Sequence, residues 1–195
     1  MLGNDHTVTV NYVEDVIGDI VINEIHTGDP DWIEFYNAGS QAVDMTGWRF
    51  LAYQFGSLAY YTYTFPTFTL QSGTYVVLHE NVGTDTATDL YTGNNSFPWP
   101  TVGGSGAAAL TNGGGSGVDF VRWGSSTVAP PSGTNWTGTN PAGPPSGQTL
   151  GRDQASTDTD DGSDWTSQDP TSGAQNQSSG SETSFIYLPL ILRNH

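Results

Sequence analysis

Short runs of alternating apolar and polar residues dominate the first two thirds of the chain and predict β-strands. Successive side chains of a strand point to opposite faces, so a period of two marks a strand with one face in a core. Turn-forming residues separate seven such runs, at 19–25, 31–37, 48–55, 60–66, 74–80, 107–112 and 118–123. No segment shows the helical period. We therefore expect an all-β protein, a β-sandwich of about seven or more strands without substantial helix.

The run DWIEFYN at 31–37 defines two faces. Its alternation places Ile33 and Phe35 together, and we assign them to the core face. The opposite face, which we expect to be wet, carries Trp32, Glu34 and Tyr36. Asp31 then belongs to the preceding turn. Two acidic residues that are close in sequence are therefore predicted to have different roles.

The preceding run, DIVINEI, alternates in the same way. Strict alternation places Ile20, Ile22 and Glu24 on one face and the residues between them on the other. Glu24 and Glu34 could nevertheless face each other on adjacent strands, as glycosidase chemistry would need two carboxylates. A shallow sandwich face offers no obvious cleft, and like charges placed directly opposite repel each other. The pattern therefore favours a non-catalytic protein.

Two long segments without strand patterns interrupt the domain, at 81–104 and 125–165. Loops of this length in a compact domain are usually functional or disordered. In the first, FPWP presents Phe97 and Trp99 between prolines, the clearest candidates for an exposed stacking surface, with Trp32 and Tyr36 as further binding candidates. In the second, Trp136 and Trp165 are the only large anchors, and we expect them to pack this segment onto the sandwich.

The composition limits the partners of the chain. Its 195 residues carry a formal net charge of -16, with four arginines, no lysine and no cysteine. A chain without a basic surface is poorly suited to nucleic acid or to an anionic membrane, so we expect neither. Absence of cysteine excludes disulfides and cysteine-based metal sites. The polar, lysine-free composition is typical of extracellular proteins, although no signal peptide is visible at the start.

The acidic stretch DTDDGSDW is the best metal candidate. Its four aspartates are Asp158, Asp160, Asp161 and Asp164. They offer the hard oxygen ligands that calcium prefers. However, Gly162 does not lie where an EF-hand would place its glycine, and no bidentate glutamate follows at the proper distance. A calcium-stabilised loop and a solvated acidic loop both remain open. A metal site at His26, Asp29 and Asp31 has neither the expected spacing nor a second histidine, and a solvated turn is the better interpretation.

We expect four parts along the chain. Residues 1–17 form an N-terminal remnant or linker, 18–177 the sandwich, 178–184 a flexible linker, and 185–195 a short apolar tail. The tail is too short to cross a bilayer, which needs about 20 apolar residues. It is either a strand added to a sheet edge or a C-terminal tag recognised by export machinery.

Six pieces in order resemble the lamin tail domain in its bacterial form. They are IVINEI with DWIEFYN, GWRF, YTFPTFTLQSGTYVVL, AALTNGGGSGVDFVRW, GQTLGRDQ with SDW, and PTSGAQN. The resemblance covers roughly residues 18–177 and implies an immunoglobulin-like sandwich, in agreement with the strand pattern. It brings no catalytic residues.

The resemblance also implies a binding or tethering role, as an accessory module of a secreted or cell-surface bacterial protein. The partner would be a protein or a glycan. Two alternatives are a structural spacer without its own ligand and an accessory domain of an extracellular hydrolase or nuclease whose catalytic part lies elsewhere.

Overall fold

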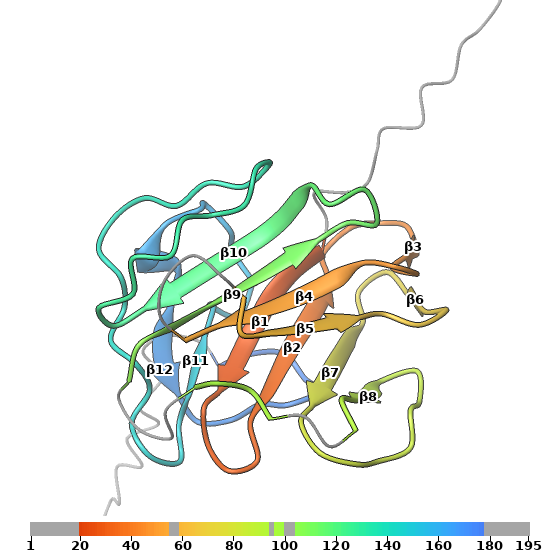
Figure 1. Ribbon diagram of the computed structural model, residues 1–195, viewed down its shortest axis with the longest axis horizontal. Coiled ribbons are helices and arrows are strands. Elements are labelled where there is room, and N and C mark those ends of the chain that lie inside the picture. Colours follow the sequence, from red (N-terminus) through yellow and green to blue (C-terminus); the bar gives the residue numbers. More distant parts are fainter. Residues whose placement is uncertain (1–19, 55–58, 94–95, 100–103, 178–195) are drawn as a thin grey trace, which may run out of the picture.

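The computed structural model describes residues 20–54, 59–93, 96–99 and 104–177 (Figure 1). They form an all-β sandwich, as the alternation predicted. In Figure 1 the strands of a smaller sheet cross over those of a larger one. The predicted N-terminal remnant, linker and apolar tail lie outside the described residues.

All seven predicted strands are present. They are β1 (Ile20–His26), β2 (Trp32–Asn37), β4 (Arg49–Tyr53), β5 (Tyr61–Thr64), β7 (Tyr75–His79), β9 (Gly106–Thr111) and β10 (Gly117–Trp123). Five short strands had no alternating pattern to reveal them: β3 (Val43–Asp44), β6 (Thr69–Leu70), β8 (Asp89–Tyr91), β11 (Thr149–Gly151) and β12 (Thr166–Gln168). The only helical element of the described residues is the short 3₁₀ turn η2 (Gly162–Asp164).

The larger sheet has six strands in the order β12-β11-β1-β2-β7-β8, and the smaller has four in the order β10-β9-β4-β5. The strands β3 and β6 pair separately. Pairing is antiparallel except between β7 and β8, which run parallel. The hairpin predicted around the glycine-rich turn at 113–117 is confirmed as β9 and β10.

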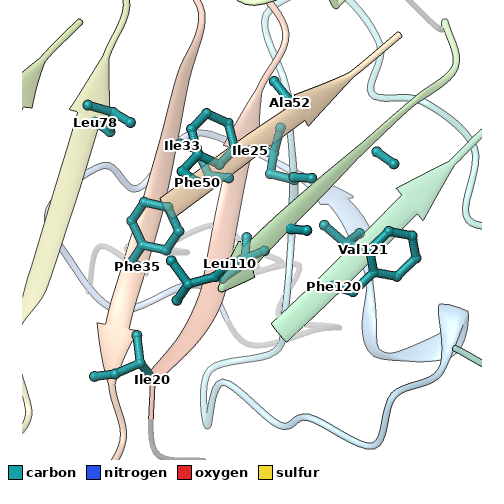
Figure 2. Close-up of a cluster of buried hydrophobic side chains, with 14 of the residues drawn as sticks. Ile20, Ile25, Ile33, Phe35, Phe50, Ala52, Leu78, Leu110, Phe120 and Val121 are labelled. Atoms are coloured by element: carbon teal, nitrogen blue, oxygen red, sulfur yellow. The ribbon is translucent and has the colours of Figure 1, made fainter. Parts of the chain in front are cut away.

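The core fills the space between the two sheets. Figure 2 shows apolar side chains from both sheets pointing toward one another, among them Ile33, Phe35, Phe50 and Leu110. The predicted core face of β2 is therefore confirmed, since Ile33 and Phe35 are fully buried. Phe35 meets Phe50 edge-to-face across the interface, an arrangement that aromatic pairs favour.

A β-bulge overturns the face that strict alternation predicted for Glu24. The pairing of β1 with β2 shifts between Ile22 and Glu24, so that Asn23 is an extra residue on β1. A bulge changes which positions share a face. Ile20, Ile22 and Ile25 all reach the core, and Glu24 faces outward with Glu34.

The long segments are anchored by their aromatic residues. Trp136 lies edge-to-face on Phe120 of β10, and Trp165 belongs to the same buried cluster, as predicted. The prediction of an exposed pair at Phe97 and Trp99 is wrong, because these rings are only 5% and 6% exposed and pack against Phe50. Burying large rings offsets the entropy cost of ordering the loop.

Arg152 joins the two sheets from within. Arg152 is the residue that directly follows β11. Its guanidinium donates to both carboxylate oxygens of Asp119 on β10, each at 3.1 Å, and to the carbonyl of Ile22 at 2.8 Å. It also stacks over the ring of Trp165 at 4.6 Å. Burial raises the pKa of Asp119 to about 6, while the nearby Arg152 acts in the opposite direction.

Candidate functional site

Four aromatic side chains form a row across the outer face of the larger sheet. His26 of β1 pairs with Trp32 of β2, Trp32 with His79 of β7, and His79 with Tyr91 of β8. Directly paired residues of neighbouring strands project from the same face. The row, which we call the aromatic row, therefore crosses four adjacent strands on the face opposite the core.

Rings of the aromatic row stack in two pairs. His26 lies on Trp32 with centroids 5.4 Å apart and planes inclined by 13°, and His79 lies on Tyr91 at 4.9 Å and 20°. Rings that stack on their neighbours along a sheet stand upright on it. Their edges and polar atoms, rather than their faces, are then left for contact with a partner.

Glycines cover the two ends of the aromatic row. A Cβ atom built on Gly28 would lie 2.0 Å from the ring of His26, and one built on Gly83 would lie 2.2 Å from the ring of Tyr91. Only a residue without a side chain lets the backbone approach so closely. The loops after β1 and β7 therefore pack against the outermost rings.

A second aromatic pair lies four residues from Trp32 and His79 on the same two strands. Tyr36 of β2 pairs with Tyr75 of β7, and their rings stack at 4.5 Å and 24°. Both are half-buried. Burial, followed by the proximity of Tyr36 and Glu34, raises the pKa of Tyr75 to about 12, so the hydroxyl group of Tyr75 is available as a neutral donor.

At the β8 end, His79 and Asp89 form an ion pair when the imidazole is protonated. His79 Nε2 lies 2.9 Å from Asp89 Oδ1, and both side chains are partly exposed. The hydroxyl of Thr88 donates to the other oxygen of Asp89 at 2.7 Å and lowers the pKa of this carboxyl, with His79 contributing further. Asp89 therefore places a carboxylate beside His79 at the β8 edge of the aromatic row.

Two buried carboxylates lie between the aromatic row and the tyrosine pair. Glu24 and Glu34 are directly opposite each other on β1 and β2, and neither has exposed surface. The prediction that Glu34 is on a wet face is therefore wrong. The segment 171–176, which we call the closing strap, covers both side chains.

The closing strap is bonded directly to these carboxylates. The backbone N–H and hydroxyl of Thr171 donate to Glu24, and the Gly173 N–H donates to Glu34 at 2.6 Å. Asn176 bonds Asn23, whose amide in turn donates to Glu34 at 2.8 Å. Burial raises the pKa of both glutamates, that of Glu34 to about 8, while these hydrogen bonds act in the opposite direction.

The exposed part of the outer face thus combines predicted and unpredicted residues. Tyr36, which was predicted from the sequence, is half-buried, whereas the prediction that Trp32 lies on a wet face is wrong, because Trp32 is only 9% exposed. Tyr75 and His79 occupy outward positions of a predicted strand, so their alternation carried a signal. Tyr91 lies on the short strand β8, in a segment whose sequence shows no alternating pattern.

Three of the four aspartates of the acidic loop at 158–164 bond through their carboxylates to other groups of the protein. Asp158 and Asp164 each pair with Arg152, at 3.1 Å and 3.4 Å. Asp161 caps η2 by accepting the Ser163 N–H, and it also accepts the hydroxyl of Thr137 at 2.7 Å. Among the residues that the structure describes, no group of three or more histidine and acidic residues is arranged to hold a metal ion.

The turn at 26–31 does not hold His26, Asp29 and Asp31 together as a metal site would require. His26 Nδ1 lies 3.2 Å from the Pro30 carbonyl and accepts the Gly28 N–H at 3.3 Å, so its polar contacts are local. Asp29 is exposed, as expected for a solvated turn, whereas Asp31 is buried. The two aspartates of the turn therefore have different surroundings.

The architecture defines the class of protein as an immunoglobulin-like β-sandwich, with two sheets, a packed interior and an aromatic outer face. The sequence profile of the lamin tail domain matches residues 14–125, and the chain belongs to the lamin tail domain family. This is a non-catalytic immunoglobulin-like family, which points to an accessory module. A comparison with curated proteins finds no match. No helix in the described part of the chain is long and apolar enough to cross a membrane.

Proposed function

We propose that the chain is a non-catalytic binding or tethering module of a secreted or cell-surface bacterial protein. The observation that supports this role is the outer face of the larger sheet, where the half-buried side chains of Tyr36, Tyr75, His79 and Tyr91 gather on three adjacent strands. Tyrosine and tryptophan are enriched where proteins contact partners, because they combine apolar area with a polar group.

The stacking of these rings favours a protein partner over a glycan. A sugar binds aromatic residues by lying on an open ring face, but here the faces of Trp32 and Tyr91 are each stacked on a histidine. The tyrosine pair is stacked in the same way. Ring edges, hydroxyl groups and the carboxylate of Asp89 suit a polypeptide that supplies hydrogen-bond acceptors, apolar side chains and basic groups.

The proposal is tested with immobilised chain, probed with a peptide display library and a glycan array. The double variant Tyr36→Ser with Tyr75→Ser alters the proposed surface. The matched control, Thr62→Ala with Thr64→Ala, alters exposed positions of β5 on the other sheet. We expect peptides to be retained by the wild type and the control, and lost from the tyrosine variant.

A structural spacer is the second candidate, and the burial of Phe97 and Trp99 favours it, because the most conspicuous aromatic pair of the sequence serves the core. A spacer predicts that wild type and tyrosine variant retain the same background set of peptides and glycans. Ligands retained equally by wild type and tyrosine variant but lost from the β5 control would move the binding surface to the smaller sheet.

A further inference from the structure

Another pair of carboxyl groups lies at one end of the sandwich, away from the closing strap. Asp31 immediately precedes β2, and Glu80 immediately follows β7. Trp32 pairs with His79, and the ladder extends one step further, because the Glu80 N–H donates to the Asp31 carbonyl at 3.1 Å. Asp31 and Glu80 are therefore neighbours across the strands.

Both side chains face the interior. Figure 2 shows Ile33 and Leu78 pointing from β2 and β7 into the core, and Asp31 and Glu80 lie two residues beyond them, on the same face by alternation. Opposite residues of an antiparallel pair have Cβ atoms about 4.5–5.5 Å apart. The two carboxyl groups therefore enter one region at the end of the core, where they are only 3% and 7% exposed.

The polar contacts of this pair are incomplete. Glu80 Oε2 accepts the Phe97 N–H at 3.0 Å. Asp31 Oδ1 is fully buried and has no hydrogen-bond partner. Within the described residues, neither carboxyl group forms a salt bridge with an arginine or histidine.

Such a pair requires neutralisation. An unpaired charge is costly to bury, and proteins avoid the cost by pairing it, protonating it or coordinating it to a metal ion. Burial, followed by the charges of Glu80 and Asp29, raises the pKa of Asp31 to about 8. Either a proton or a cation would relieve the repulsion between the carboxylates of Asp31 and Glu80. The two explanations lead to different predictions.

We propose that Asp31 and Glu80 bind a calcium ion at this end of the sandwich. Two carboxylates match the charge of a divalent cation, and Asp31 Oδ1 is a buried acceptor without a partner. Because no third acidic or histidine side chain of the described residues completes a cluster, carbonyl oxygens and water would fill the remaining positions. Calcium tolerates irregular shells of six to eight oxygens, whereas magnesium requires a near-ideal octahedron and retains its water.

The test uses the full chain after removal of divalent ions with EDTA. Thermal unfolding is followed with calcium chloride, with magnesium chloride, and with sodium chloride at equal ionic strength. We expect calcium to raise the unfolding midpoint of the wild type beyond either control, because a ligand that binds only the folded state stabilises it. The rise should grow as pH increases through about 8, since protons compete for Asp31.

Three variants locate the ion. The calcium-dependent rise is expected to disappear in Asp31→Asn and in Glu80→Gln, and to persist in Asp160→Asn, which removes a half-buried carboxylate from the acidic loop. Loss in Asp160→Asn with retention in the other two variants would assign the ion to the acidic loop and overturn the proposal.

Calorimetric titration of the wild type with calcium alone covers the case in which Asp31→Asn or Glu80→Gln does not fold. One site is expected, and the absence of binding overturns the proposal. The alternative is that a shared proton neutralises the pair. In that case calcium has no effect, the wild type loses stability above pH about 8, and Asp31→Asn does not show this loss.

Discussion

Glu24 on β1 and Glu34 on β2 lie directly opposite each other, and both side chains are fully buried beneath the closing strap. Like charges in this relation destabilise a sheet unless other groups compensate them. The compensation comes from Thr171 and Gly173, whose backbone N–H groups both donate to the pair. The segment that follows β12 is thereby attached to β1 and β2.

The protonation of Glu34 should make stability depend on pH. Its pKa rises from 4.5 in the unfolded chain to about 8 in the folded protein, so the folded state binds more protons between these values. Its contribution is complete below pH about 4.5 and is lost as pH rises through about 8. Urea unfolding of wild type and Glu34→Gln across this range should show a smaller decline for the variant.

Asp44→Asn is the control for this comparison. Asp44 is exposed, and the hydroxyl and N–H of Thr46 lower the pKa of its carboxyl, so its titration lies at acidic pH. The control should follow the wild type at neutral and basic pH. Parallel curves for wild type and Glu34→Gln would show that the carboxyl of Glu34 titrates normally in the folded state.

Removing the guanidinium of Arg152 should destabilise the protein strongly. Arg152→Ala leaves Asp119 buried without its cation, and breaking a buried ion pair from one side costs about 3–5 kcal/mol. The free energy of unfolding at neutral pH measures the effect. Arg49→Ala, at an exposed position of β4, should remain within about 0.5 kcal/mol of wild type.

A double variant distinguishes the interaction between Arg152 and Asp119 from the other contacts of Arg152. Arg152→Met combined with Asp119→Leu removes both charges, so its cost should be smaller than the sum of the two single variants. Additive costs would mean that Arg152 acts through its bonds to the Ile22 and Thr157 carbonyls rather than through Asp119.

Phe97→Ala tests whether the FPWP stretch belongs to the core. The ring contacts Phe50, Tyr61 and Trp99. Truncating a buried phenylalanine costs about 3–5 kcal/mol, and we expect a loss of that size in denaturant unfolding. Peptide binding to folded Phe97→Ala should be unchanged. A neutral effect on stability would contradict the packed position of this loop.

Gly162 should not tolerate a side chain. A Cβ atom there would lie 2.0 Å from the carbonyl oxygen of Thr139, so the backbone of one segment must move. We expect Gly162→Ala to cost about 1–3 kcal/mol, as overpacking does. Gly113→Ala is the control, because its nearest neighbour would lie 3.8 Å away. Equal stability of the two variants would show that the approach is looser.

The candidate surface was only partly predictable. The alternation around Trp32 and Tyr36 placed both on the face opposite the core. That His79 and Tyr91 extend this surface depends on the β2–β7 and β7–β8 pairing, which joins residues far apart in the chain. Phe97 and Trp99 were misassigned because a pattern of aromatic residues and prolines does not indicate which side of a loop meets the core.

The sequence by itself determined the class of fold. Seven strands, the β9–β10 hairpin and the core face of β2 follow from local alternation and turn residues, because strand geometry imposes a period of two on any half-buried sheet. The six pieces that resemble the lamin tail domain, taken in their order along the chain, were enough to indicate the family.

Only the tertiary structure decided the fate of the acidic residues. The bulge at Asn23 places Glu24 opposite Glu34, the closing strap covers them from about 140 residues further along, and strand pairing brings Asp31 beside Glu80. Local pattern describes which way a side chain points from its own strand. Whether a carboxylate is solvated, bonded or left without a partner depends on distant segments that pack against that face.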